Sequence, residues 1–185
     1  MITLKGDRII LTPATLDDRR RIYDWMAHSD ITCQMMGPPE FEDNPIPEWE
    51  FFINDYNPDF FNDEDPDQGR SYIIQVNGVS VGHINYNEIE RSTNTAELDI
   101  WMAGSRFCNK GYGSDAIKTL CHYLATQLHC PRFILAPSAR NKNAIRAYEK
   151  CGFKISSEIP PGFIPDYVDT VVMIKDAKGI REDNP

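Results

Sequence analysis

The segment from Thr95 to Leu135 constrains the fold more than any other part of the chain. Its centre, 112–128, predicts an amphipathic helix, because its apolar residues recur at the spacing of one helical face. Those residues are Ile117, Leu120, Cys121, Leu124, Ala125 and Leu128. Strand-forming segments at 95–102 and 132–135 flank the helix. The three segments together predict a β-α-β unit with parallel strands.

Turn and cap signals place the other elements. Asn77-Gly78 separates two strand-forming segments, 71–76 and 79–87, and is the strongest short hairpin signal. A helix over 16–27 follows the Thr15-x-x-Asp18 box, and a helix over 141–151 ends at Gly152, where a left-handed residue is favoured. Further strands are expected at 8–11, 154–159 and 170–174. The order predicts an α+β fold with a mixed, mostly antiparallel sheet flanked by helices.

Composition narrows the class of protein. The chain has 185 residues, which suits one domain over 1–185, and its net charge of -9 argues against nucleic-acid binding. No stretch approaches the roughly 18 apolar residues of a membrane helix, and no leader is expected. The 5 cysteines include no Cys-x-x-Cys pair, so neither a disulfide framework nor a zinc site is indicated. We expect a cytoplasmic protein without a metal.

The charge is unevenly distributed along the chain. Residues 38–67 hold eleven acids and six prolines, whereas 106–154 hold nine basic residues and two acids. We interpret 38–70 as an acidic, loop-rich insert. Within it, Pro47 begins a short helix with Trp49, Phe52 and Ile53, and 57–70 forms an exposed loop. The two regions could steer a cationic substrate and an anionic cofactor, or both could simply be solvated surfaces.

The loop Arg106-Phe-Cys-Asn-Lys-Gly-Tyr-Gly-Ser114 joins a strand to the long helix. Glycines at a helix start let backbone amides turn towards an anion, so this loop is a candidate pyrophosphate site. It is neither a Walker loop nor a dinucleotide fingerprint, because it lacks Gly-Lys-Ser/Thr and a third glycine. A nucleotide-binding domain for NAD or ATP nevertheless remains an alternative.

Two segments carry a family resemblance. The loop and helix at 106–128 and the run Asn141-Lys-Asn-Ala-Ile-Arg-Ala-Tyr-Glu-Lys-Cys-Gly-Phe153 resemble the signature motifs of the GNAT superfamily of acetyl-coenzyme A (acetyl-CoA) dependent N-acetyltransferases. The resemblance covers about 71–175, and the N-terminal third only in outline. It is strongest to bacterial aminoglycoside 6′-N-acetyltransferases, with ribosomal-protein N-terminal acetyltransferases second. Cys108 departs from the family, which usually has Gln or Arg there.

The resemblance implies a GNAT-like sheet and a set of cofactor-binding residues. Amides of the loop would hold the pyrophosphate, Arg106 would add positive charge, and the strand edge near 102 would pair with the pantetheine arm. Asn141 would lie near the cofactor, or would simply cap its helix. The implied cofactor-binding residues are Trp101, Met102, Cys108, Asn109, Lys110, Gly111, Tyr112, Gly113, Ser114, Asn141 and Tyr148.

The same resemblance assigns the chemistry. Tyr148 resembles the general acid that protonates the departing thiolate, although its place on the apolar helix face equally suits a core tyrosine. Asp99 and Glu97 share one face of their strand, where they would bind the substrate ammonium or face solvent. The resemblance points to Asp99 as the base. The four histidines show no ligand spacing and are expected to be surface or strand residues.

These expectations describe an enzyme that transfers acetyl from acetyl-CoA to a primary amine by direct attack in a ternary complex. The expected acceptor is a cationic small molecule such as an aminoglycoside, which would link the enzyme to antibiotic resistance. The expected assembly is a monomer or homodimer. The alternatives are a protein or peptide N-terminal acetyltransferase and a non-catalytic acetyl-CoA-binding module.

Overall fold

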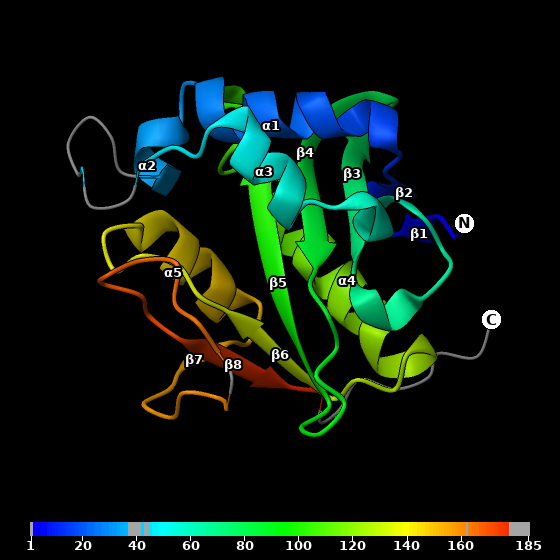
Figure 1. Ribbon diagram of the computed structural model, residues 1–185, viewed down its shortest axis with the longest axis vertical. Coiled ribbons are helices and arrows are strands. Elements are labelled where there is room, and N and C mark those ends of the chain that lie inside the picture. The colour runs from blue at the N-terminus through cyan, green and yellow to red at the C-terminus, as the bar shows by residue number, and fades with distance from the viewer. Residues whose placement is uncertain (1, 37–41, 43–44, 162, 178–185) are drawn as a thin grey trace.

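In the described part of the chain, the strands form one eight-stranded sheet (Figure 1). The computed structural model describes residues 2–36, 42, 45–161 and 163–177. The strand order is β1-β2-β3-β4-β5-β6-β8-β7, and β5 and β6 are the one parallel pair among the described strands. This arrangement confirms the mixed, mostly antiparallel α+β sheet. The strands are β1 (Leu4–Lys5), β2 (Ile10–Pro13), β3 (Arg70–Val76), β4 (Val79–Tyr86), β5 (Thr95–Met102), β6 (Arg132–Leu135), β7 (Lys154–Ile155) and β8 (Met173–Asp176).

Helices cover both faces of the sheet (Figure 1). The core between the sheet and α4 and α5 contains Leu11, Leu98 and Leu120, and a second core beneath α1, α2 and α3 contains Ile22, Phe52 and Ile73. The sheet is therefore the middle layer of three. The helices are α1 (Arg19–His28), α2 (Thr32–Met36), α3 (Trp49–Asp55), α4 (Tyr112–Gln127) and α5 (Lys142–Lys150). The short 3₁₀ turns are η1 (Leu16–Asp18), η2 (Pro58–Phe61), η3 (Pro66–Gln68) and η4 (Ser105–Phe107).

The strongest local signals are confirmed. Asn77 and Gly78 have φ angles of 50° and 76°, the two left-handed residues that a tight hairpin turn requires. Gly152 ends α5 with φ of 90°. Thr15 and Asp18 form a capping box at the start of η1, and η1 leads directly into α1. In α4, the apolar face is buried as its period predicts.

The segment 57–70 corrects an expectation, because it is not simply an exposed loop. It contains η2 and η3, and two of its residues are buried: Phe61 is 5% exposed and Arg70 is 2% exposed. Arg70 pairs with Asp63, with 3.1 Å between Nε and Oδ1. Aromatic residues anchor this segment against the second core, an effect that the polar, proline-rich composition concealed.

Other differences are at element boundaries. Pro47 precedes α3, which begins at Trp49, and the last two strands are 154–155 and 173–176 rather than 154–159 and 170–174. The unpredicted elements β1 and α2 have two and five residues, too few for a period to be read. Residues 37–41 and 43–44 of the acidic insert lie outside the described residues.

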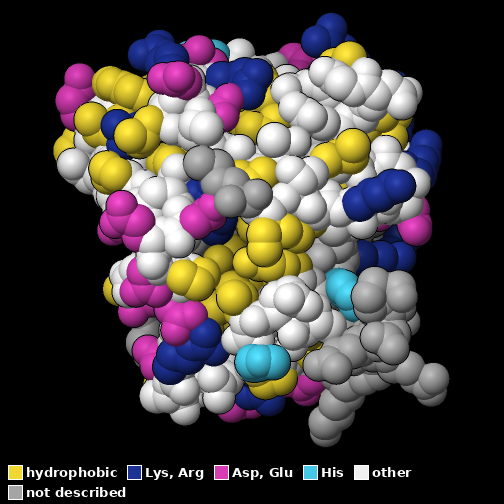
Figure 2. Space-filling view, turned by 90° about the vertical axis from the view of Figure 1, so that its right-hand side faces the viewer, with side chains coloured by type: hydrophobic (Ala, Val, Ile, Leu, Met, Phe, Trp, Pro, Cys, Tyr) yellow, Lys and Arg dark blue, Asp and Glu magenta, His cyan; other side chains and the backbone are white. Residues whose placement is uncertain are grey.

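Charges of both signs are mixed on the surface. Figure 2 shows the side that is on the right in Figure 1, with acidic and basic side chains around its margin and hydrophobic side chains near its centre. On this face most acidic side chains lie towards the left of the view, and basic side chains lie on both sides. Among the described helices, none has the length and apolar character needed to cross a membrane.

Candidate active site

The polar residues of β5 lie on one face of that strand. Ala96 and Leu98 are buried in the core beneath α4, whereas Trp101 packs with the core beneath α1 to α3. Glu97 and Asp99 lie on the same face of the strand as Trp101, and they are partly buried rather than freely exposed. The alternation expected from the sequence is confirmed, and plain solvent exposure does not describe this face.

Asp99 belongs to a hydrogen-bonded network that spans two strands. Asn85 lies opposite it across the β4–β5 ladder, and the Asn85 and Asn87 Nδ2 atoms donate to Asp99 Oδ2 at 3.4 and 3.2 Å. The Tyr56 hydroxyl donates to Asn85 Oδ1 at 3.2 Å. Because Asn85 accepts on its oxygen, its amide group is turned towards the carboxylate. The network therefore holds Asp99 in one orientation.

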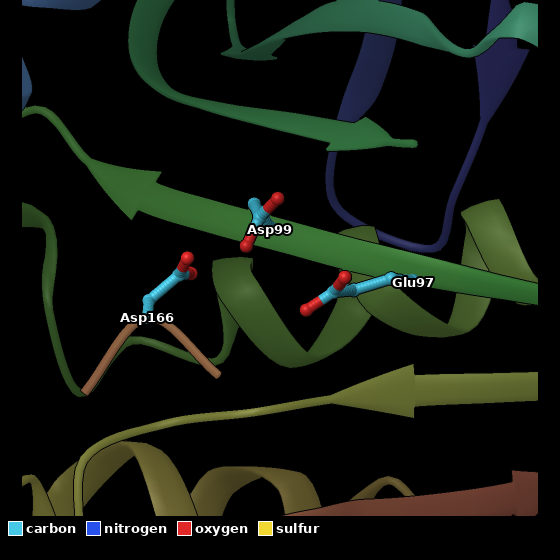
Figure 3. Close-up of side chains that lie close together, drawn as sticks. All are labelled: Glu97, Asp99 and Asp166. Atoms are coloured by element: carbon cyan, nitrogen blue, oxygen red, sulfur yellow. The ribbon is translucent and has the colours of Figure 1, made fainter. Parts of the chain in front are cut away.

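A third carboxylate, which the sequence did not reveal, joins Glu97 and Asp99. Asp166 lies in the connection between β7 and β8, and one oxygen from each of the three carboxyl groups lies within 4.8 Å of the other two. Figure 3 shows the three side chains converging beside β5. Clustered carboxylate oxygens can bind an ammonium group, and they are also the ligands preferred by hard divalent cations.

Burial and mutual repulsion hold protons on this cluster. Burial first, and then the charge of Asp166, raises the pKa of Asp99 to about 6. Burial and the neighbouring acids raise the pKa of Glu97 to about 8, and burial raises the pKa of Asp166. Three adjacent carboxylates cannot all be charged without a counter-cation, so the cluster favours a bound cation.

The site opens where β5 and β6 diverge. The two strands pair only over 95–97 and 132–134, which leaves the rest of this β5 edge without a strand partner in the described part of the chain. A cavity of about 50 Å³ at this point is lined by Asp99, Trp101, Asn141, Tyr148, Asp166 and Tyr167, among others. A cleft of about 440 Å³ between α2 and the start of α5 shares Asn141 and Tyr167 with it. The cavity and the cleft therefore adjoin.

Tyr148 lines this cavity from α5. The residue is 9% exposed, and burial followed by the charge of Asp99 raises the pKa of its hydroxyl. The phenol is therefore protonated at neutral pH and able to donate. Asn141 caps α5, because its Oδ1 accepts from the amide of Ala144 at 3.1 Å. Its capping role is confirmed, and it also lines the cavity.

The loop before α4 presents unused amides. Asn109 and Gly111 adopt left-handed conformations, with φ of 57° and 81°. From Asn109 into the first turn of α4, the backbone amides of residues 109–114 donate to no acceptor among the residues that the structure describes. Consecutive free amides at a helix start form an anion-binding concavity. The Cys108 amide is already used, donating to the Ser105 carbonyl at 3.0 Å.

Two other residues are better understood from the structure. The Cys108 thiol contacts the Gly104 carbonyl at 3.6 Å, and burial raises its pKa, so it is a thiol rather than a reactive thiolate. His83 is a strand residue that is fully buried, and burial lowers its pKa to about 3. A neutral, enclosed imidazole does not act as the base near pH 7.

Comparisons with known proteins identify the family. The GNAT acetyltransferase domain matches residues 8–154. The chain belongs to this family of acetyltransferases.

Two curated relatives illustrate the similarity. A spermine/spermidine N(1)-acetyltransferase of Bacillus subtilis is 32% identical over 79 residues, which are 43% of this chain and 48% of that protein. An aminoglycoside N(6′)-acetyltransferase of Klebsiella pneumoniae is 24% identical over 164 residues, covering 83% of this chain and 78% of that protein. The chain thus spans about half the length of the first curated relatives that it matches.

Solved structures share the fold. The aminoglycoside acetyltransferase AAC(6′)-Ib, in complex with ribostamycin and coenzyme A (CoA), has a TM-score of 0.73 at 21% identity and covers 97% of this chain and 99% of its own. A ribosomal L7/L12 α-N-protein acetyltransferase in complex with CoA has a TM-score of 0.71 at 15% identity, covering 95% and 98%. At these identities the likeness concerns the fold.

Proposed function

We propose that the protein transfers an acetyl group from acetyl-CoA to a primary amine of a cationic small molecule. The observation that carries this proposal is the placement of Asp99 and Tyr148 on one small cavity, where β5 and β6 diverge. An acid–base pair that lines one narrow space suits direct attack by a bound amine. Family membership supplies the expectation of acetyl-CoA as co-substrate.

The cofactor is proposed to lie along two open features. The free amides of 109–114 bind its pyrophosphate, with Arg106 and Lys110 adding positive charge. The unpaired β5 edge beyond Glu97 gives the pantetheine arm backbone partners, and that edge leads towards Tyr148. Trp101, Met102 and Asn141 lie along this path. The thioester then reaches the cavity that Asp99 also lines.

The acceptor is proposed to enter as an ammonium ion. Glu97, Asp99 and Asp166 surround the space in which its charge would be neutralised (Figure 3). A lysine-like amine has a pKa of about 10.4, so it must lose a proton before it can attack. A pKa of about 6 makes Asp99 a stronger base than an ordinary aspartate, which reduces the cost of this transfer by about 1.4 kcal/mol for each unit.

Proton and bond changes balance in this mechanism. Asp99 takes a proton from the ammonium, the amine nitrogen forms a bond to the thioester carbon, and the carbon–sulfur bond breaks. Tyr148 gives its proton to the departing thiolate, and the second amine proton is lost to solvent as the amide forms. Asp99 and Tyr148 thus provide the proton transfers at the attacking nitrogen and at the departing sulfur. No metal is needed, and we expect EDTA to leave the rate unchanged.

Asp166 is proposed to select polycationic acceptors. It approaches the cluster from the β7–β8 connection and is more exposed than Asp99. A second ammonium of the same acceptor could pair with it while the first is deprotonated. We expect Asp166→Asn to raise the KM of spermidine about three- to fivefold, the effect of roughly 1 kcal/mol. The KM of a monoamine should change less, and Asp59→Asn, an exposed control on η2, should change neither.

The first test is a thiol-release assay with acetyl-CoA and a panel of acceptors. The panel contains aminoglycosides, spermidine, a monoamine of similar length and N-terminal peptides, each with and without EDTA. Turnover confined to polycationic amines supports the proposal. Binding of CoA with no turnover on any amine would instead indicate a non-catalytic module.

A peptide α-amine is the second candidate. The 440 Å³ cleft beside the cavity is larger than one ammonium requires, and it is lined by Lys142, by neutral side chains and by Arg140, which pairs with Asp169 at 3.1 Å. An acidic N-terminal peptide would complement the charge of Lys142. Turnover on acidic peptides and not on polyamines would favour this second function.

The cellular role follows from the acceptor. If aminoglycosides are acetylated, expression in sensitive bacteria should raise the inhibitory concentration, which is the antibiotic-resistance role. We place the enzyme in the cytoplasm because all five cysteines are free thiols in the structure, a state that a reducing compartment maintains. A monomer or homodimer is proposed as the active unit.

A further inference from the structure

The β1–β2 hairpin turn is docked on the first turns of α4. The Gly6 amide donates to the Ile9 carbonyl at 3.0 Å and closes the turn. At its tip, the amides of Asp7 and Arg8 donate to the Asp115 carboxylate at 3.2 and 2.7 Å. A Cβ at Gly6 would lie 2.6 Å from Thr119 Oγ1, so this close approach requires glycine. The hairpin is therefore held in a defined position on the helix.

This docking places the Arg8 side chain on the loop that precedes α4. The Arg8 Nη1 atom donates to the Lys110 carbonyl at 2.6 Å, and its guanidinium carbon lies 5.2 Å from the centre of the Tyr112 ring. The same Nη1 lies 3.3 Å from the position that a Gly111 Cβ would occupy. Arg8 thus contacts the middle of the segment whose amides are unused.

The guanidinium keeps donors available. An arginine side chain has five N–H donors. Among the described residues, the Arg8 guanidinium donates one hydrogen bond, from Nη1 to the Lys110 carbonyl. The residue is exposed, so its remaining donors can reach a ligand from solvent. A planar fork of this kind matches the geometry of a phosphate group.

We propose that Arg8 binds a phosphate group of CoA, so that the N-terminal hairpin completes the cofactor site. This inference rests on the proposed function, because it takes the 109–114 loop as the phosphate-binding loop. The backbone amides of Asp7 and Arg8 also engage the Asp115 carboxylate, whose charge would otherwise oppose a dianion at the start of α4. The phosphate is either the pyrophosphate or the 3′-phosphate, and the two are distinguishable with dephospho-CoA.

The test measures the Kd of CoA by calorimetry, without an acceptor, for wild type, Arg8→Gln, Arg8→Lys and Lys5→Gln. Lys5 is an exposed cation on the same hairpin, so its variant controls for the loss of one charge. Titrations are run at about 0.1 M and about 1 M NaCl, where the Debye length is about 10 Å and about 3 Å. Thermal unfolding confirms that each variant is folded.

The expected result is a salt-dependent loss. At low salt Arg8→Gln should weaken CoA binding about five- to tenfold, Arg8→Lys less, and Lys5→Gln less than twofold. At high salt the Arg8→Gln loss should shrink to about twofold. An equal loss with dephospho-CoA assigns the pyrophosphate, and a loss seen only with CoA assigns the 3′-phosphate.

Other results would overturn the inference. Wild-type affinity in Arg8→Gln would remove Arg8 from the site. An equal loss at both salt concentrations, without recovery in Arg8→Lys, would reduce Arg8 to a brace for the loop. This test needs no acceptor. If wild type binds CoA and Arg8→Gln binds it equally well, the inference about Arg8 fails, and the proposed acetyl transfer is unaffected.

Discussion

Asn85 lies directly opposite Asp99 across the β4–β5 ladder and donates a hydrogen bond to its carboxylate at 3.4 Å. This bond stabilises the charged carboxylate and lowers its pKa, against the larger effect of burial, which raises it. Burial and the charge of Asp166 outweigh this bond, and they leave Asp99 with a pKa of about 6, which suits a general base near neutral pH.

Removing this donor should shift the pH dependence upwards. In Asn85→Ala the pKa of Asp99 rises further, so the acidic limb of the kcat/KM profile moves to higher pH. Tyr56→Phe, which removes the hydroxyl that orients Asn85, should shift the limb in the same direction and by less. The measurement is a kcat/KM profile from about pH 5 to about pH 9. A downward shift would show that Asn85 does not stabilise the charged form.

Tyr148→Phe should lower kcat without weakening cofactor binding. The substitution removes one hydroxyl and keeps the buried ring, so the protein should stay folded. Loss of a general acid costs about 10²- to 10⁴-fold in rate, and we expect the lower part of that range. Steady-state kinetics and CoA calorimetry provide the measurement, with Tyr123→Phe as a control. Unchanged kcat would make Tyr148 a core residue only.

The carboxylate cluster should make stability depend on pH. The pKa of Glu97 is raised from 4.5 to about 8, so the folded state holds a proton that the unfolded state has lost between these values. The stabilising contribution is present below about pH 4.5 and is lost as the pH rises to about 8.

Glu97→Gln should therefore flatten the fall in Tm over that window. The variant should gain stability relative to wild type at pH 8, and a gain of about 1 kcal/mol corresponds to about 2–4 °C for a chain of this size. Glu149→Gln, an exposed control on α5, should follow the wild-type curve. Parallel curves for wild type and Glu97→Gln would contradict the raised pKa.

The sequence predicts those features that depend on neighbouring residues. The helix α4, the Asn77-Gly78 turn and the Gly152 terminus follow from local periodicity and backbone preference, and they are confirmed. The placement of Glu97 and Asp99 on one face of β5 follows equally from the local alternation of polar and apolar residues. The fold and part of the candidate site could therefore be anticipated from short segments.

The remaining site residues depend on contacts between distant segments. Asp166 lies in an irregular connection without a period, and its approach to Asp99 depends on how β7 and β8 pair beyond β6. Arg8 meets Lys110 only because the hairpin docks on α4. Gly6 permits the close approach of the hairpin to α4 that positions Arg8. A glycine in a turn does not by itself predict such an approach, because turns use glycine for several purposes.

The most direct test of the account is the pH profile of kcat/KM for wild type and Asp99→Asn on the preferred acceptor. We predict that the wild-type profile has an acidic limb with an apparent pKa near 6, which belongs to the coupled carboxylates. Asp99→Asn should lose at least about 100-fold in kcat/KM, together with that limb. A variant that keeps the wild-type rate and profile would contradict the assignment of Asp99 as the base.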